Sequence, residues 1–92
     1  NRAPVADAGP NQTTTQTQIT LDGSRSYDPD GDPITYSWRV SGAKPAEIIG
    51  GNTATPTVRF QQGWGDYIFE LTVTDDKGAR STSTTLVNYI DP

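Results

Sequence analysis

Ile34-Thr-Tyr-Ser-Trp-Arg-Val40 alternates apolar and polar side chains along its whole length. Successive side chains of a β-strand point to opposite faces, so the apolar side chains share one face and the polar ones the other. The segment therefore predicts a strand with one buried face, on which Trp38 supplies the central aromatic side chain of the core.

A second segment, Tyr67-Ile-Phe-Glu-Leu-Thr-Val73, repeats this alternation and predicts another strand. Its inward-facing side chains are expected to be Tyr67, Phe69, Leu71 and Val73. Shorter strands are expected at residues 5–8, 18–21, 56–60 and 81–90. In the last of these the pattern fits two core-facing sets: Thr85, Val87 and Tyr89, or Leu86, Asn88 and Ile90.

About seven short strands, separated by turns rich in Gly, Pro and Asp, predict an all-β, immunoglobulin-like Greek-key β-sandwich. We expect a single domain of this kind over residues 1–92. Tyr67 follows Gly65 by two residues at the start of a late strand, which is the position of a tyrosine corner. Because the chain has no cysteine, packing alone must hold the sheets together.

The composition excludes several classes of protein. The chain has no Cys, no His and no Met, and its formal charge is −4. It therefore has no imidazole base, no thiol nucleophile and no zinc site with nitrogen or sulfur ligands. Seven scattered Lys and Arg residues in an acidic chain argue against nucleic-acid binding. With 32% hydrophobic residues and a mean hydropathy of −0.64, neither a membrane span nor a signal peptide is expected.

Acidic residues concentrate in two turn segments, Asp28-Pro-Asp-Gly-Asp32 and Asp75-Asp-Lys-Gly78. In the predicted sandwich both segments and Asn1 lie at the same end. The carboxylates would repel one another there unless a cation lay between them, and Ca²⁺ accepts several oxygen ligands from flexible loops. Alternatively, these are ordinary hairpin turns in which the Asp side chains accept hydrogen bonds from backbone amides. The spacing fits both interpretations.

Two other functions for these acidic residues, an EF-hand loop and a catalytic pair, are excluded. Asp28, Asp30 and Asp32 match the opening of an EF-hand loop, but the twelfth position is Arg39 rather than a bidentate Glu. Paired acids such as Asp28 and Asp75 can also drive glycoside hydrolysis. However, a small sandwich fills its interior with side chains and leaves no cleft, and turn tips lack an apolar pocket to raise one pKa. Catalysis is therefore not expected.

An ordered set of motifs covers nearly the whole chain. These are residues 1–10 (Asn-Arg-Ala-Pro-Val-Ala-Asp-Ala-Gly-Pro), 21–24 (Leu-Asp-Gly-Ser), 26–31 (Ser-Tyr-Asp-Pro-Asp-Gly), 36–38 (Tyr-Ser-Trp) and 71–78 (Leu-Thr-Val-Thr-Asp-Asp-Lys-Gly). In this order they resemble the PKD (polycystic kidney disease) domain family. The family's usual Trp-Asp-Phe-Gly-Asp-Gly reads Trp-Arg-Val-Ser-Gly-Ala at residues 38–43, which is similar to a bacterial PKD-like subgroup from secreted multidomain enzymes.

The resemblance implies a module of an extracellular multidomain protein, often a protease, collagenase, chitinase or other polysaccharide-degrading enzyme. In some members, notably in secreted collagenases, Ca²⁺ binds at the N-terminal end of the module. The matching positions are Asn1, the carbonyl of Arg2, Asp28, Asp30, and Asp75 or Asp76.

Trp64, between Gly63 and Gly65, lies in a predicted turn outside the alternating core pattern. One interpretation is an exposed indole that stacks on a sugar ring or on proline-rich collagen, as the resemblance implies for some modules of secreted enzymes. The other is a hydrophobic lid that folds back over the end of the sandwich.

We therefore expect a monomeric, secreted, non-catalytic accessory or spacer module of a bacterial multidomain enzyme or surface protein. Its expected ion is Ca²⁺, and its expected partners are the neighbouring domains of the same chain, strung in line because the termini lie at opposite ends. The alternative is a substrate-targeting module that binds insoluble polysaccharide or collagen through Trp64.

Overall fold

The computed structural model describes residues 3–42 and 44–90, which form strands, turns and loops. The strands are β1 (Gln12–Thr14), β2 (Gln18–Thr20), β3 (Ile34–Val40), β4 (Ala46–Ile49), β5 (Thr57–Phe60), β6 (Gly65–Asp75) and β7 (Arg80–Tyr89). Over these residues there is no helix long and apolar enough to cross a membrane.

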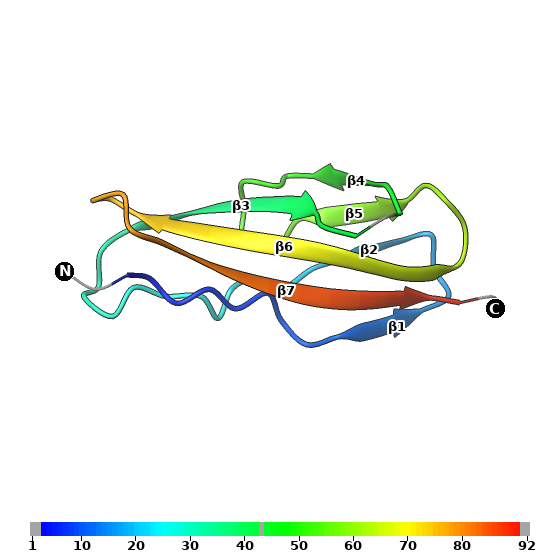
Figure 1. The fold of residues 1–92 in the computed structure, drawn as a ribbon, viewed down its shortest axis with the longest axis horizontal. Helices are drawn as coiled ribbons and strands as arrows, with labels where there is room; N and C mark the ends of the chain where they lie inside the picture. Colours follow the sequence, from blue (N-terminus) through cyan, green and yellow to red (C-terminus); the bar gives the residue numbers. More distant parts are fainter. Residues whose placement is uncertain (1–2, 43, 91–92) are drawn as a thin grey trace.

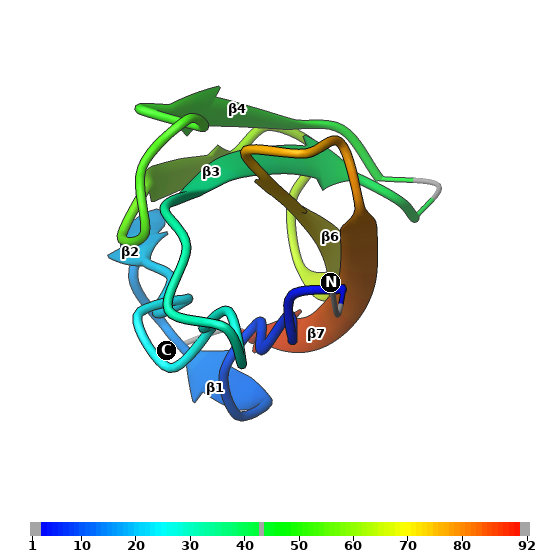
Figure 2. The same cartoon turned by 90° about the vertical axis from the view of Figure 1, so that its left-hand side faces the viewer.

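The strands form two sheets, one with the order β1-β7-β6-β3 and one with the order β2-β5-β4. β1 runs parallel to β7, whereas the other neighbouring strands pair antiparallel. Figure 2 looks along the long axis and shows the two sheets curving around a common interior. The predicted all-β, immunoglobulin-like sandwich is confirmed.

The core lies between the sheets; β6 supplies four of its side chains, and β3, β5, β7 and the segments around β1 and β2 supply the others. The fully or nearly buried apolar side chains are Ala8, Leu21, Trp38, Val58, Tyr67, Phe69, Leu71, Val73 and Val87. All four predicted inward side chains of β6 belong to this set. The period-two pattern therefore identified the buried face of the central strand.

Trp38 is 6% exposed, and its Nε1 donates a hydrogen bond of 2.9 Å to the carbonyl of Thr53. This bond satisfies the polar atom of a buried indole. Gly23 lies directly against the ring, because a Cβ there would come within 2.7 Å of Trp38 Cζ2 and 2.9 Å of Leu71 Cδ2. The packing of Trp38 thus requires glycine at position 23.

Gly23→Ala is expected to lower the free energy of unfolding by about 1–3 kcal/mol, because the new methyl group must displace Trp38 or Leu71. Gly51→Ala is the control, since the nearest atom to its added Cβ is the Ile48 methyl at 3.2 Å, which needs only a small shift. Urea denaturation measures both variants. An equal loss of stability in the two would contradict this account of Gly23.

Tyr67 forms the predicted tyrosine corner. Its side chain is fully buried, and its hydroxyl donates a 2.7 Å hydrogen bond to the carbonyl of Gly63. The same hydroxyl accepts a hydrogen bond of 3.0 Å from the amide of Gln62. These two bonds hold the β5–β6 turn, and therefore fix the backbone on both sides of Trp64.

Tyr67→Phe is expected to cost about 1–2 kcal/mol of stability, because both hydrogen bonds of the hydroxyl are lost. Tyr36→Phe is the matched control, since the Tyr36 hydroxyl has no hydrogen-bond partner among the described residues. Thermal unfolding of both variants tests the difference. A loss no larger for Tyr67→Phe than for Tyr36→Phe would show that the corner contributes nothing to stability.

The strand prediction needs three refinements. Residues 5–8 form no strand, and Val5 makes only an isolated antiparallel bridge with Tyr27. β1 and β4 were not predicted, because β1 consists of Gln and Thr and the short β4, Ala-Glu-Ile-Ile, does not sustain an alternation of apolar and polar side chains. In β7 the first alternative is correct, because Thr85 and Val87 are buried whereas Ile90 is 41% exposed.

The molecule is elongated, with extents of 46 × 18 × 18 Å. Figure 1 shows the β2–β3 connection and the β6–β7 turn at the end where the chain starts. The β5–β6 turn lies at the opposite end, where β7 finishes. We call these the N-terminal end and the C-terminal end.

Candidate functional site

The pairing of β3 with β6 brings the two acidic turns together. Ile34, the first residue of β3, lies opposite Asp75, the last residue of β6. The residues just before Ile34 and just after Asp75 therefore meet at the N-terminal end. Hydrogen-bonded antiparallel partners lie about 5 Å apart, so side chains of both turns can converge there.

Each turn is held by one oxygen of its first Asp. Asp28 Oδ1 accepts a 2.7 Å hydrogen bond from the amide of Asp30. Asp75 Oδ1 accepts hydrogen bonds of 2.9 Å from the amides of Lys77 and Ala79. Short polar side chains commonly hold turns in this way. The turn interpretation of these acids is thus confirmed for one oxygen of each carboxylate.

Three carboxylates converge between the turns. Asp28, Asp32 and Asp75 each place one oxygen within 4.8 Å of the others. Asp28 is 8% exposed and Asp75 is 6% exposed, so both carboxylates are more than nine-tenths buried. The Oδ2 atoms of Asp28 and Asp75 are buried and have no hydrogen-bond partner among the described residues.

The described residues do not fully compensate the negative charge and the buried oxygens of this cluster. A buried polar atom without a partner costs about 1–3 kcal/mol, and more if it is charged. The negative charges of the three carboxylates also repel one another. A divalent cation that prefers oxygen ligands would remove both penalties, and carboxylates from loops are the ligands that Ca²⁺ takes. The donor set therefore fits a calcium ion.

Lys77 places a positive charge at the rim of this cluster. Its Nζ lies 3.0 Å from Asp32 Oδ2 and 3.5 Å from Asp76 Oδ1. The hydrogen bond to Asp32 and the charge of that carboxylate raise the pKa of Lys77, with a further contribution from Asp76. The ammonium thus contacts only the outer acids, and it reaches neither buried Oδ2 atom.

Only some of the residues predicted as calcium ligands lie in the carboxylate cluster. Asn1 and Arg2 lie outside the described residues. Asp28 and Asp75 are brought together, whereas Asp30 is exposed and contributes its amide to the Asp28 turn. The sequence leaves Asp75 and Asp76 as alternatives. The geometry favours Asp75, because the Asp76 carboxylate is exposed and contacts Lys77.

Asp32 belongs to the cluster, although the predicted ligand set did not contain it. The signal for it was present, because Asp28, Asp30 and Asp32 occupy alternate positions of one loop. The sequence contains no comparable indication for Lys77, since a lysine is common in surface turns such as Asp-Asp-Lys-Gly.

Trp64 lies at the C-terminal end, in the turn held by the tyrosine corner. Its side chain is 56% exposed, so it does not form the buried lid that was one interpretation of the sequence. Tyr27, at the other end of the molecule, is similarly exposed at 55%. The exposed indole is available for stacking on a flat ligand surface.

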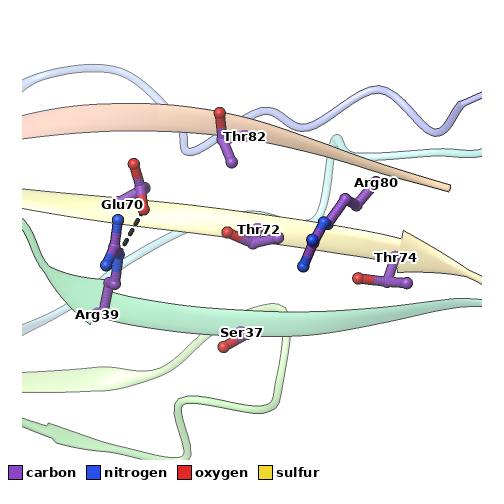
Figure 3. Close-up of a pocket in the computed structure, with 7 residues that line it drawn as sticks. All are labelled: Ser37, Arg39, Glu70, Thr72, Thr74, Arg80 and Thr82. Carbon is purple, nitrogen blue, oxygen red and sulfur yellow. Dashed lines mark hydrogen bonds and ion pairs between the residues drawn. The ribbon is translucent and has the colours of Figure 1, made fainter. Parts of the chain in front are cut away.

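An open polar hollow lies on the outer face of the larger sheet (Figure 3). Side chains of β3, β6 and β7 line it: Ser37, Arg39, Glu70, Thr72, Thr74, Arg80 and Thr82. Glu70 is the one carboxylate in this lining, and it is ion-paired with Arg39. The hollow therefore lacks the two carboxylates of a glycosidase and the aromatic platform of a sugar-binding face.

The topology, the tyrosine corner and the carboxylate cluster define an immunoglobulin-like module with an acidic N-terminal end. Comparison with known families identifies the family within this class. The family model described as K319L-like, PKD domain matches residues 8–88. The chain therefore belongs to the PKD domain family, as the sequence motifs indicated.

Relatives occur in animals and bacteria. Dyslexia-associated protein KIAA0319-like protein of Mus musculus is 38% identical over 84 residues, which are 87% of this chain and 8% of that protein. Chitinase A of Pseudoalteromonas piscicida is 36% identical over 93 residues, which cover 100% of this chain and 11% of that protein. The chain thus spans about a tenth of the length of these curated relatives.

Solved structures support the same assignment. The solution structure of the PKD domain from KIAA 1837 protein superposes with a TM-score of 0.78 at 32% sequence identity. The match covers 99% of this chain and 90% of that structure. The whole sandwich, and not only one sheet, is therefore shared.

Proposed function

We propose that this chain is a non-catalytic accessory and spacer module of a secreted multidomain enzyme, and that Ca²⁺ stabilises its N-terminal end. The observation that carries the calcium part is the pair of buried oxygens of Asp28 and Asp75, which have no hydrogen-bond partner among the residues that the structure describes. The similarity to one segment of a bacterial chitinase supports the enzyme context. The elongated shape supports a spacer, because it separates the neighbouring segments along one axis.

Calcium would act by connecting segments that the backbone leaves separate. Asp28 and Asp32 belong to the β2–β3 connection, and Asp75 belongs to the end of β6. Asn1 and the Arg2 carbonyl complete the proposed ligand set, and they would tie the start of the chain to both turns. An ion at this place would stiffen the joint between the module and whatever precedes it.

A catalytic role receives no support from either polar site. The unpartnered oxygens of Asp28 and Asp75 are buried, so a polymer cannot reach them. In the outer hollow, Glu70 is ion-paired with Arg39 and has no second carboxylate beside it. Two carboxylates flanking a substrate are what glycoside hydrolysis requires.

Thermal unfolding in excess Ca²⁺ and then in EDTA tests the calcium proposal. At a concentration of about ten times Kd the ion adds about 1.4 kcal/mol, which for a domain of this size raises Tm by about 5–10 °C. Asp75→Asn is expected to lose this response, because it keeps an oxygen for the turn but removes the charge. Asp66→Asn, the same change on an exposed residue at the other end of β6, should keep it.

Identical midpoints for the unaltered chain in Ca²⁺ and EDTA would reject the calcium proposal. A response that survives Asp75→Asn but disappears in Asp66→Asn would place the ion elsewhere. Magnesium is a useful comparison in the same experiment, since it requires near-octahedral geometry and keeps several of its waters.

The second candidate function is substrate targeting through Trp64, and the observation that favours it is the 56% exposure of this side chain. Trp64 lies in a turn whose backbone is fixed by two hydrogen bonds of the Tyr67 hydroxyl, one donated to Gly63 and one accepted from Gln62. With the backbone fixed, only the two side-chain dihedral angles of Trp64 must be ordered when the ring stacks on a ligand, which costs little conformational entropy. Insoluble polysaccharide and collagen are the polymers to which this surface would bind.

Retention on insoluble chitin, cellulose and collagen tests this second function. The unaltered chain is expected to be retained on one of them, and Trp64→Ala should reduce the bound fraction severalfold by removing the stacking surface. Tyr27→Ala is the matched control, because it removes an equally exposed aromatic ring at the opposite end. If no polymer retains the unaltered chain, the targeting function is rejected.

A further inference from the structure

We infer that Lys77 is a tethered competitor for the cation site, which weakens Ca²⁺ binding and keeps the ion-free domain folded. This inference rests on the proposed calcium site. It concerns the one cationic side chain that contacts the acidic cluster within the described part of the chain.

Lys77 is connected to the cluster through both its backbone and its side chain. Its amide donates a 2.9 Å hydrogen bond to Asp75 Oδ1, and its Nζ donates a 3.0 Å hydrogen bond to Asp32 Oδ2. The residue thus spans two of the three clustered carboxylates. Because the amide is fixed in the turn, the ammonium stays within reach of Asp32 in the folded domain.

The ammonium neutralises only part of the cluster. It satisfies Asp32 and Asp76 at the rim, while the buried Oδ2 atoms of Asp28 and Asp75 receive no hydrogen bond from the described part of the chain. Within the described residues, the cluster of three carboxylates from Asp28, Asp32 and Asp75 is contacted by one ammonium, that of Lys77, through Asp32. Enough negative charge therefore remains to attract a divalent ion.

The sign of the effect follows from charge and position. A calcium ion that shares Asp32 with Lys77 lies close to the ammonium, and like charges repel even at the high dielectric of a protein surface. The Lys77 side chain is 55% exposed, so it can move into solvent when the ion enters. Calcium therefore binds either against the repulsion of the nearby ammonium or after the Lys77–Asp32 pair has broken, and its affinity falls in both cases.

This competition has a consequence for the module. Without calcium, Lys77 offsets part of the repulsion among the acids, so the N-terminal end stays assembled. With calcium, the ion replaces it and connects the buried oxygens that Lys77 cannot reach. The joint would then stiffen only at the high calcium concentrations at which weak extracellular sites fill.

Lys77→Gln tests the inference, with calcium binding measured by titration calorimetry and Tm measured in EDTA and in excess Ca²⁺. The variant is expected to bind Ca²⁺ about three- to tenfold more tightly, since the repulsion is removed. In EDTA it should melt below the unaltered chain, and in excess Ca²⁺ this difference should shrink or reverse.

Two controls separate the charge at this position from other causes. Lys77→Arg keeps the positive charge and should retain the original affinity. Lys44→Gln makes the same charge change at the C-terminal end, where the lysine side chain lies beside Gly65, and should also leave the affinity unchanged. A gain in affinity that appears equally in either control would overturn the inference.

Different titration results would reject this inference and the proposed calcium site. If the unaltered chain and Lys77→Gln bind Ca²⁺ equally, or the variant binds more weakly, the competitor role is wrong and the site stands. If Lys77→Gln binds Ca²⁺ and the unaltered chain does not, the inference is supported in its strongest form. If none of the variants binds Ca²⁺, the site itself is rejected, and the inference with it.

Discussion

The antiparallel pairing of β3 with β6 is the constraint on which both the core and the acidic site depend. Its register sets Trp38 opposite Leu71 between the sheets and Ile34 opposite Asp75 at the N-terminal end. A slip of one residue would turn Trp38 toward solvent and separate the two acidic turns. The same hydrogen-bonded ladder thus specifies a buried indole and a cluster of carboxylates.

The turn interpretation applies to one oxygen of each of the Asp28 and Asp75 side chains, and the proposed cation would bind the other. In Asp28 and Asp75, Oδ1 accepts hydrogen bonds from amides of its own turn. This bonding fixes the direction of the carboxylate, so that Oδ2 is left buried without a donor from residues 3–42 or 44–90. An acid that stabilises a turn is therefore also positioned for a cation, and Asp32 adds a third oxygen from the same loop as Asp28.

Much of the fold could be predicted from the sequence because the long strands carry a period of two. The alternation around Trp38 and Tyr67 identified the central strands, and the position of Tyr67 after Gly65 predicted its hydrogen-bonded corner. β1 could not be found this way, since its Gln and Thr side chains show no apolar period and it pairs with β7 at the edge of the sheet.

The site could be predicted only in part, because strand order can be inferred from the sequence whereas individual side-chain contacts cannot. Topology placed the acidic turns at one end, which is a property of strand order and needs no side-chain detail. Which oxygens remain unpartnered depends on distances of a few tenths of an ångström, and the contact between Lys77 and Asp32 joins residues far apart in the sequence. Neither feature has a signature in a single sequence.

The most direct test of a cation site between the buried oxygens is a calcium titration followed by amide NMR chemical shifts. The amides of Asp30, Lys77 and Ala79 bond directly to the clustered carboxylates and therefore report on them. The account predicts saturable shifts confined to the two acidic turns, with one ion bound per chain. Shifts that do not saturate, or that spread evenly over the acidic surface, would contradict it.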